Sequence, residues 1–310
     1  MTTRPHVLVL GGGPDAERPV SIKSATAIAE GLRASDRFEV TLDIIDTLSA
    51  EQLAQRPGDL LFPYLHGPWG EGGALQDILE ADGRPFVGSG SRAARWAMDK
   101  IATKACAMGL GMPTPAFHVL NTRDQTCPLS FPVVVKPVHE GSTIGLHVCN
   151  DAEAFASAIA AVRAEQARGI VRAYMVEPRI IGRELTVGVI GDEALPIIQI
   201  TPAEGLYDYQ AKYHRDDTRY TVAPSLPAGL TERLQADALR LHRALGCHDI
   251  SRTDFMLDAA GTPWLLEINT TPGFTDHSLV PKAARHMGIE MPALCARLAD
   301  LAIARRSARV

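Results

Sequence analysis

The sequence lacks the cysteine and leader patterns of secreted and membrane proteins. Its 310 residues include five cysteines, an odd number, and none of them forms a Cys-x-x-Cys pair. A disulfide framework or a cysteine zinc site is therefore not expected, and the cysteine usage favours a reducing cytoplasm. No apolar run reaches the roughly 18 residues of a membrane helix, and the N-terminus has no signal-peptide pattern. We expect a cytoplasmic protein without a membrane partner.

Motifs for several chemistries are also missing. The chain contains no G-x-x-x-x-G-K-[ST] P-loop and no His-Glu-x-x-His zinc motif. Its formal net charge is −5, which gives no reason to expect nucleic acid as a partner. What is present is an ordinary globular composition, 46% hydrophobic and 22% charged, in a chain long enough for two or three domains.

Short apolar runs alternate with helical stripes along the chain. The expected strands cover residues 6–10, 38–45, 60–65, 131–136, 146–149, 171–177, 185–190, 195–200, 251–258 and 264–273. The expected helices cover residues 20–32, 75–81, 93–108, 153–166, 230–245 and 292–305. Residues 109–115 are rich in glycine and proline and indicate a hinge. This alternation predicts an N-terminal doubly wound parallel-sheet domain, followed by two further α/β segments.

Polar side chains alternate with apolar ones in the last two expected strands. Arg252 and Asp254 share one face of the first strand, and Glu267 and Asn269 share one face of the second. If the strands are neighbours, three oxygen ligands meet beside a guanidinium. Such hard ligands suit Mg²⁺, which also binds substrate phosphates. Polar strand ends on a solvated face are the other interpretation, because any half-buried strand alternates in this way.

Two segments between the hinge and this cluster indicate a nucleotide. Lys136 ends an apolar strand, and residues 139–145 form a loop of glycine and serine that can cradle phosphate oxygens; alternatively, Lys136 extends its ammonium to solvent. Glu177 and Glu184 flank a turn where an adenine or ribose can bind, unless they only solvate that turn. The long polar segment of residues 207–219, with three tyrosines and a lysine, suggests a lid; alternatively it is an exposed loop.

The first glycine-rich turn has two interpretations. Residues 11–16 match a dinucleotide fingerprint after a strand, but Pro14 removes a backbone donor and no acidic residue follows at the usual spacing. The alternative is a substrate pocket in which Glu17 meets a cation and Ser21 orients it. His66 stands at the end of another strand, where function is more frequent than for a lone histidine elsewhere.

Taken together, these pieces resemble the D-alanine–D-alanine ligase family of the ATP-grasp superfamily. The resemblance spans essentially the whole chain and keeps the family's motif order. The resembling segments are Ala16-Glu17-Arg18-Pro19-Val20-Ser21, Leu65-His66-Gly67, Met98-Asp99-Lys100, Val135-Lys136-Pro137, Glu140-Gly141-Ser142, Tyr207-Asp208-Tyr209-Gln210-Ala211-Lys212-Tyr213, Arg252-Thr253-Asp254, Glu267-Ile268-Asn269-Thr270-Thr271-Pro272-Gly273 and His277-Ser278-Leu279-Val280-Pro281.

The resemblance implies a fold and a division into domains. Residues 1–95 would be an N-terminal substrate-binding α/β domain. Residues 96–181 would be the central ATP-grasp domain, and residues 182–310 the C-terminal ATP-grasp domain with the lid and the magnesium site. The implied activity is ATP-dependent joining of two D-alanines through a D-alanyl phosphate, for peptidoglycan synthesis and hence cell-wall biogenesis and cell shape. ATP and D-alanine would be its partners and a homodimer its assembly.

The resemblance also assigns roles to residues. The implied ATP-binding set is Lys100, Lys136, Ser142, Glu177, Ile180 and Glu184. The implied ligands of two Mg²⁺ ions, with Mn²⁺ as a substitute, are Asp254, Glu267 and Asn269. The implied substrate-binding set is Glu17, His66, Lys212, Ser278 and Leu279, and the implied catalytic set is Glu17, Ser142, Tyr213, Arg252 and Gly273. Arg252 and the backbone at Gly273 would stabilise an oxyanion.

The chain departs from the family pattern in several places. Gln210 replaces a glutamate of the lid motif, Gly72 stands where an aspartate is usual, and Thr143-Ile144 replaces Ser-Val. None is an expected metal ligand, so the reaction class is unaffected. Tyr213 favours an amine over a hydroxyl nucleophile. The open alternatives are a ligase for another amino or hydroxy acid, an NAD-dependent oxidoreductase that uses the first glycine turn, and an ATP-binding regulator without catalysis.

Overall fold

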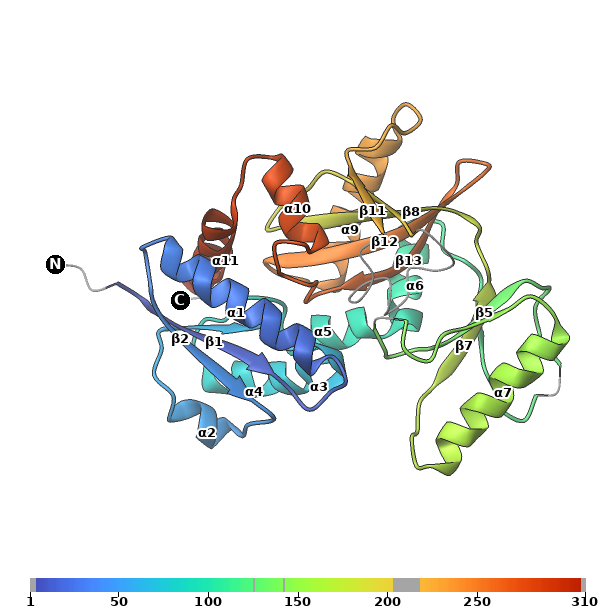
Figure 1. The fold of residues 1–310 in the computed structure, drawn as a ribbon, viewed down its shortest axis with the longest axis horizontal. Helices are drawn as coiled ribbons and strands as arrows, with labels where there is room; N and C mark the ends of the chain where they lie inside the picture. The colour runs from blue at the N-terminus through green and yellow to red at the C-terminus, as the bar shows by residue number, and fades with distance from the viewer. Residues whose placement is uncertain (1–3, 125, 142, 203–217, 308–310) are drawn as a thin grey trace.

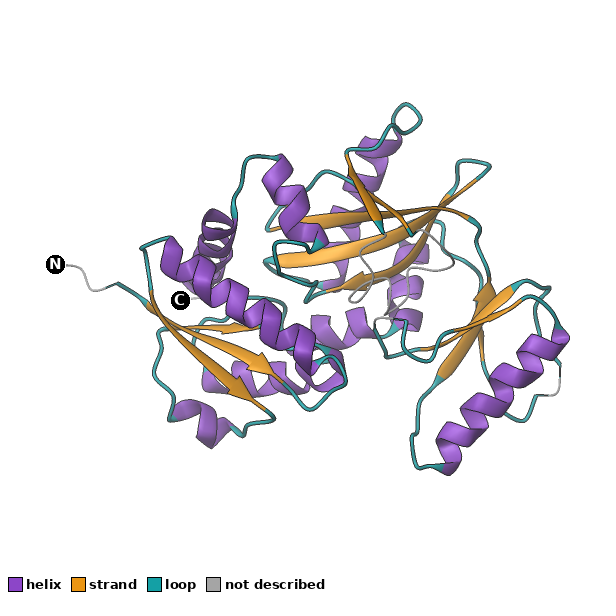
Figure 2. Cartoon of the chain, in the orientation of Figure 1, coloured by secondary structure: helices purple, strands orange, loops and turns teal. Residues whose placement is uncertain are grey.

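A computed structural model describes residues 4–124, 126–141, 143–202 and 218–307. The described chain forms three separate sheets, each covered by helices (Figures 1 and 2). The expected α/β fold, with a parallel N-terminal sheet, is confirmed. In the part of the chain that is described, no helix combines the length and apolar character needed to cross a bilayer.

The first sheet is parallel and has helices on both faces. Its strand order is β2-β1-β3, with β1 at His6–Gly12, β2 at Glu39–Ile45 and β3 at Leu60–Pro63. Odd and even positions of β1 enter different cores, because strand side chains alternate. Val7 and Val9 pack with α1, and Leu8 and Leu10 pack with α2 and α4. These helices are α1 (Arg18–Ala34), α2 (Ala50–Ala54) and α4 (Ala74–Asp82).

The single helix expected at residues 93–108 is wrong, because two helices occupy that stretch. They are α5 (Ser91–Met98) and α6 (Lys100–Gly109). Asp99 between them is extended, and its carboxylate accepts hydrogen bonds from the amides of Ile101 and Ala102. A carboxylate in this position caps a new helix. The break turns Lys100 toward the cavity described below.

The central sheet is antiparallel, with strand order β4-β7-β5-β6, and α7 packs against one face. Helix α7 begins after Asp151, whose carboxylate accepts a hydrogen bond from the amide of Ala154 at 2.8 Å. The expected strand at 171–177 begins later, at residue 174. The elements are β4 (His118–Val119), β5 (Val133–Pro137), β6 (His147–Cys149), β7 (Tyr174–Pro178) and α7 (Ala152–Ala167).

The C-terminal sheet has strand order β11-β10-β8-β12-β13, and β9 pairs with β8. Its strands are β8 (Gly182–Ile190), β9 (Glu193–Ala194), β10 (Ile198–Thr201), β11 (Arg219–Val222), β12 (Ile250–Asp258) and β13 (Pro263–Asn269). The helix expected at residues 230–245 is confirmed as α9 (Leu230–Leu245). Together α5, α6 and α9 cover one face of this sheet. The sequence did not lead us to expect β4, β9, β11, α2, α3 (Gly67–Glu71) or α10 (Leu279–His286).

The last helix, α11 (Met291–Ser307), returns to the first sheet and lies beside α1 (Figure 1). The two helices approach closely at Gly31, where a Cβ atom would lie 2.9 Å from the sulfur of Cys295. Arg305 pairs with the buried carboxylate of Asp249 and donates to the carbonyl of Phe86 at 2.6 Å. The core around α1 is therefore completed by residues from the opposite end of the described chain.

Candidate active site

The two pairs of polar residues expected to meet do meet. In the antiparallel pair of β12 and β13, Arg252 lies opposite Asn269 and Asp254 lies opposite Glu267. The register shifts directly after Asp254, where a bulge increases the local twist. The polar ends of both strands therefore form one cluster at the edge of a buried sheet.

Asp254 is buried and held by two neighbours. Arg252 donates two hydrogen bonds to the carboxylate of Asp254, from Nε to Oδ1 at 2.9 Å and from Nη2 to Oδ2 at 2.8 Å. The hydroxyl of Thr186 on β8 donates to Oδ1 at 2.5 Å. A two-point guanidinium contact fixes both groups in orientation as well as in charge.

The other carboxylate of the cluster meets a lysine from α6. The Nζ of Lys100 lies 3.2 Å from Oε2 of Glu267 and donates to the carbonyl of Glu140 at 2.5 Å. Lys100 therefore connects β13 with the loop that follows β5 and contains Glu140 and Gly141. The amide oxygen of Asn269 accepts from the backbone of Thr271 at 2.7 Å.

The buried carboxylate of Glu177, on the central sheet, lies between two lysines. Glu177 on β7 has Lys136 2.5 Å from Oε1 and Lys104 2.8 Å from Oε2. The two ammonium groups lower the pKa of this carboxyl below its usual value despite burial, which acts in the opposite direction. Lys104 also donates to the Oγ1 of Thr114 and the carbonyl of Pro115, both at 2.9 Å.

A cavity of about 330 Å³ opens between the central and C-terminal sheets. Its lining combines charged and apolar side chains, and this combination suits a ligand with a flat ring and anionic groups. The expected ATP-binding and metal-binding residues that line it are Lys100, Lys136, Glu177, Ile180, Glu184, Asp254 and Glu267. The apolar lining includes Val134, Ile144, Leu146, Met256 and Leu266.

Glu17 and His66 lie on the first sheet's side of the site, and both are buried. Glu17 immediately precedes α1, and a Cβ on Gly141 would lie 3.4 Å from its Oε2, so the carboxylate faces the glycine-containing loop. Burial, with a smaller effect from Arg252, lowers the pKa of His66 to about 4. This histidine is therefore neutral at physiological pH.

The remaining expected residues lie between β13 and α10. Gly273 belongs to the connecting segment, Ser278 precedes α10 and Leu279 is its first residue. The hydroxyl oxygen of Ser278 accepts from the amide of Thr275 at 2.9 Å. A cavity of about 30 Å³ is lined by Lys100, Glu267 and Asn269 among others, and also by Glu71. Ser142, Lys212 and Tyr213 lie outside the described residues.

The oxygen donors fit a hard divalent cation. Asp254 and Glu267 face each other across paired strands, with Asn269 on the same face of β13 as Glu267. Two carboxylates and an amide are the donors that Mg²⁺ takes alongside water and phosphate. In the described part of the chain no group of three or more histidine, cysteine, aspartate or glutamate residues is placed to hold a metal, so the amide of Asn269 is needed to complete the set.

Sequence reasoning missed Lys104 and Glu71. Lys104 is four residues after Lys100 in an otherwise small and apolar helix, and a lysine on the buried side of such a helix is a detectable anomaly. Glu71 at the end of α3 is buried, and burial together with Glu17 raises its pKa well above the usual value. Only its place in a glycine-rich loop after His66 marked it in the sequence.

Comparison with known proteins places this arrangement in context. A family model described as the D-ala D-ala ligase C-terminus matches residues 110–300. A D-alanine–D-alanine ligase of Nitrosomonas europaea is 42% identical over 301 residues, covering 95% of this chain and 96% of that protein. The ligase of Marinomonas sp. is 43% identical, covering 95% of this chain and 94% of that protein.

Solved structures agree with the sequence relatives. The D-alanine–D-alanine ligase of Bacillus anthracis in complex with ATP superimposes with a TM-score of 0.82 at 27% identity, covering 99% of this chain and 100% of that chain. The enzyme of Coxiella burnetii superimposes with a TM-score of 0.83 at 27% identity, covering 99% and 96%.

Proposed function

The chain belongs to the D-alanine–D-alanine ligase family, and we infer on that premise that it is an ATP-dependent enzyme that joins two D-alanines into D-alanyl-D-alanine. The dipeptide is the product that peptidoglycan synthesis consumes. The observation that carries this function is the register of β12 and β13, which brings Arg252, Asp254, Glu267 and Asn269 into one cluster. That cluster borders a cavity lined by two lysines.

ATP occupies the cavity of about 330 Å³ in this proposal. Lys100 and Lys136 contact its phosphates, and the loop with Ser142 covers them. Glu177, Ile180 and Glu184 hold the adenosine. The support is the lining of the cavity, which combines two lysines, of which Lys100 pairs with Glu267, with apolar side chains that suit a base.

The two Mg²⁺ ions belong at Asp254, Glu267 and Asn269, and Mn²⁺ can substitute. When bound, they offset the charge of the phosphates that the lysines alone do not neutralise. Arg252 and Lys100, which hold Asp254 and Glu267 in their present orientation, then contact substrate groups as well as these carboxylates.

The first D-alanine lies near Glu17 and His66. The buried carboxylate of Glu17 receives its ammonium, and a neutral His66 does not repel that charge. The carboxylate of this D-alanine attacks the γ-phosphorus of ATP, the bond to the bridging oxygen breaks, and ADP leaves. Lys100 and Lys136 reduce the repulsion between these two anionic groups.

The second D-alanine attacks the acyl phosphate as a free amine. Ser278 and Leu279, with Lys212, hold its carboxylate. A C–N bond forms and the carbonyl oxygen becomes an oxyanion. Phosphate then leaves as the carbonyl re-forms, and the proton that the nitrogen loses ends on the departing phosphate. Arg252 and the Gly273 amide donate to the oxyanion. The family resemblance assigns Glu17 to one hydrogen-bonded set with Ser142 and Tyr213, which lie outside the described residues.

Three further features are part of the proposal. We propose domains at residues 1–95, 96–181 and 182–310, supported by the three separate sheets. We propose a cytoplasmic location, because ATP is consumed there and all five cysteines are free thiols. The homodimer rests on the family alone, with neither nucleic acid nor membrane as partner.

The direct test is release of ADP from Mg²⁺-ATP that depends on D-alanine, with the dipeptide identified by mass. D-serine, D-lactate and L-alanine are assayed in parallel, because a few pocket contacts worth about 1–3 kcal/mol each decide between such substrates. ADP and D-alanyl-D-alanine appearing in equal amounts is the expected result. Turnover with another acid alone would assign the enzyme a different substrate. Absence of ADP release with all of them would refute catalysis.

A further inference from the structure

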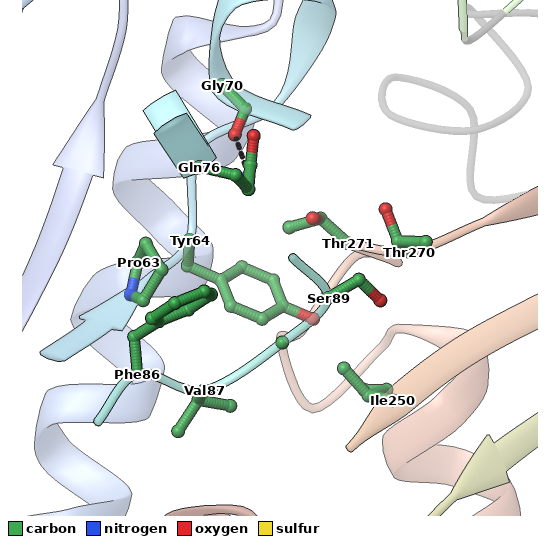
Figure 3. Close-up of a pocket in the computed structure, with 11 residues that line it drawn as sticks. Pro63, Tyr64, Gly70, Gln76, Phe86, Val87, Ser89, Ile250, Thr270 and Thr271 are labelled. Carbon is green, nitrogen blue, oxygen red and sulfur yellow. Dashed lines mark hydrogen bonds between the residues drawn. The ribbon is translucent and has the colours of Figure 1, made fainter. Parts of the chain in front are cut away.

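The segment that carries Gly273 is tied to the first sheet through a buried phenol. The hydroxyl of Tyr64 donates to the carbonyl of Pro272, the residue directly before Gly273. Tyr64 follows β3 and is 1% exposed. In Figure 3 its hydroxyl lies across a small cavity from Pro63, on the side where Ser89 lies. Residues distant in sequence therefore meet at a single buried hydrogen bond.

Tyr64 is itself held in place. The hydroxyl of Ser21 donates to the Tyr64 carbonyl at 2.7 Å and accepts from the Gly12 amide at 2.8 Å. The Tyr64 ring packs against the rings of Phe274, at 5.3 Å, and His66, at 5.8 Å between centroids. Because both its backbone and its ring are fixed, the direction of its hydroxyl is fixed as well.

A second contact holds the other side of Gly273. The amide of Phe274 donates to the hydroxyl of Ser24 on α1 at 3.2 Å, and Ser24 is fully buried. Gly273 therefore lies between Pro272, which bonds to Tyr64 after β3, and Phe274, which bonds to Ser24 on α1. A Cβ at Gly273 would lie 3.1 Å from Ser278 Oγ, so the side chain of Ser278 lies close beside this residue.

We propose that Tyr64 is a positioning residue that orients the amide of Gly273 toward the oxyanion of the second chemical step. This inference rests on the proposed function, in which that amide donates to the oxyanion. A donor stabilises a developing charge only when it already points at it, and a shift of about 1 Å can cost about 10²-fold in rate. The hydroxyl of Tyr64 supplies this orientation from the first sheet without touching either substrate.

The proposal makes a distinctive chemical prediction. Phosphoryl transfer precedes oxyanion formation, so a misplaced Gly273 leaves ADP release possible while attack by the amine slows. Water then competes for the acyl phosphate. Its oxygen bonds to the phosphorus, the bond from phosphorus to the carboxylate oxygen breaks, and D-alanine and inorganic phosphate are released without an oxyanion at the acyl carbon. ADP then exceeds dipeptide.

The experiment compares Tyr64→Phe with the unmodified enzyme. The substitution keeps the ring and its packing and removes only the hydroxyl. ADP and D-alanyl-D-alanine are quantified in the same reactions, together with the KM for ATP. We expect the ratio of ADP to dipeptide to rise above one, dipeptide formation to fall roughly tenfold or more, and the KM for ATP to stay unchanged.

Two further variants make the result decisive. Ser24→Ala removes the other anchor of the segment and leaves Tyr64 intact, so we expect the same rise in the ratio. Ser89→Ala removes a hydroxyl that lines the same small cavity but accepts from the amide of His248, at 3.1 Å, and we expect its ratio to remain one. Thermal melting identifies any loss of folded protein.

The outcomes separate this inference from the function on which it rests. If Tyr64→Phe keeps a ratio of ADP to dipeptide of one and forms dipeptide as fast as the unmodified enzyme, the positioning role is overturned. An equal loss of ADP and dipeptide also overturns it, because that result means the hydroxyl supports the whole fold or the first step. If the unmodified enzyme itself releases no ADP with D-alanine, the proposed function fails and this inference fails with it.

Discussion

The ammonium of Lys104 lies 2.8 Å from the carboxylate of Glu177, and the two side chains are 0% and 5% exposed. Burial lowers the pKa of Lys104 to about 8, against the opposing effect of Glu177. Lys104 also reaches Thr114 and Pro115, and Thr114 donates to the carbonyl of Leu265 on β13 at 2.9 Å. One lysine therefore connects the central sheet with the strand that carries Glu267.

Replacing this lysine should weaken both the fold and ATP binding. In Lys104→Met, Glu177 keeps only Lys136, and removing one member of a buried pair costs about 3–5 kcal/mol. We expect the free energy of unfolding in urea to fall by that order and the KM for ATP to rise, with the KM for D-alanine unchanged. In Arg240→Met, which removes a half-exposed partner of Asp237, the loss should stay below about 1 kcal/mol. Equal losses in the two variants would contradict the prediction.

The metal assignment is tested on a single strand. Asp254→Asn keeps the shape of the side chain but removes a carboxylate charge. We expect ADP formation to fall at least about 10²-fold and Mn²⁺ binding, followed by electron paramagnetic resonance, to weaken. Asp258→Asn is the matched control, because Asp258 lies further along β12 and bonds to Trp264 and Thr262 instead. Retained Mn²⁺ binding in Asp254→Asn would remove Asp254 from the metal site.

Buried histidines should make the protein less stable in mild acid. Burial lowers the pKa of His242, like that of His66, from 6.5 to about 4. The unfolded chain therefore takes up protons between pH 6.5 and 4 that the folded chain does not. Stability is full above pH 6.5 and is lost toward pH 4, by at most about 3 kcal/mol for each histidine.

Urea unfolding across this pH range measures the effect. His242→Gln should flatten the decline, because the substituted residue no longer titrates. Its partner, the hydroxyl of Ser251 at 2.7 Å, can still bond to the amide. His286→Gln, at an exposed position, should leave the decline as it is. A slope that both variants leave unchanged would show that other groups cause the acid sensitivity.

Two glycines should respond in opposite directions to alanine. A Cβ on Gly182 would lie 1.9 Å from the carbonyl oxygen of Leu257, so Gly182→Ala must separate β8 from β12. We expect it to lower the free energy of unfolding by about 1–3 kcal/mol and to raise the KM for ATP, since Gly182 lines the cavity. Gly109→Ala meets no atom within 4 Å and should raise the free energy of unfolding by about 0.5–1 kcal/mol. Melting temperatures of both variants check the prediction.

Periodicity predicted much of this architecture because its cause is local. The alternation at Arg252, Asp254, Glu267 and Asn269 follows from strand geometry, and the pairing of β12 with β13 then brought the two sets together. The helix at residues 230–245 was predicted for the same reason, from a pattern contained within one element.

Features that depend on distant partners were not predicted. The burial of Lys104 follows from the position of Glu177 on β7, and the orientation of Tyr64 follows from Pro272. The packing of α11 on α1 joins segments that no local pattern relates. The break at Asp99 is different, because an aspartate before Lys100 caps a helix through local contacts alone. It was missed because the apolar pattern on either side of it is continuous with one helix.

The position of α11 has a consequence for synthesis of the protein on the ribosome. Leu294 and Leu298 of this helix fill the core beside α1, so α1 and β3 emerge from the exit tunnel with part of their apolar surface still uncovered. That surface is buried only after residues 291–307 have been translated. Nascent chains with exposed apolar surface are the ones that associate with chaperones and aggregate, so the interval before α11 emerges is the vulnerable period of its biogenesis.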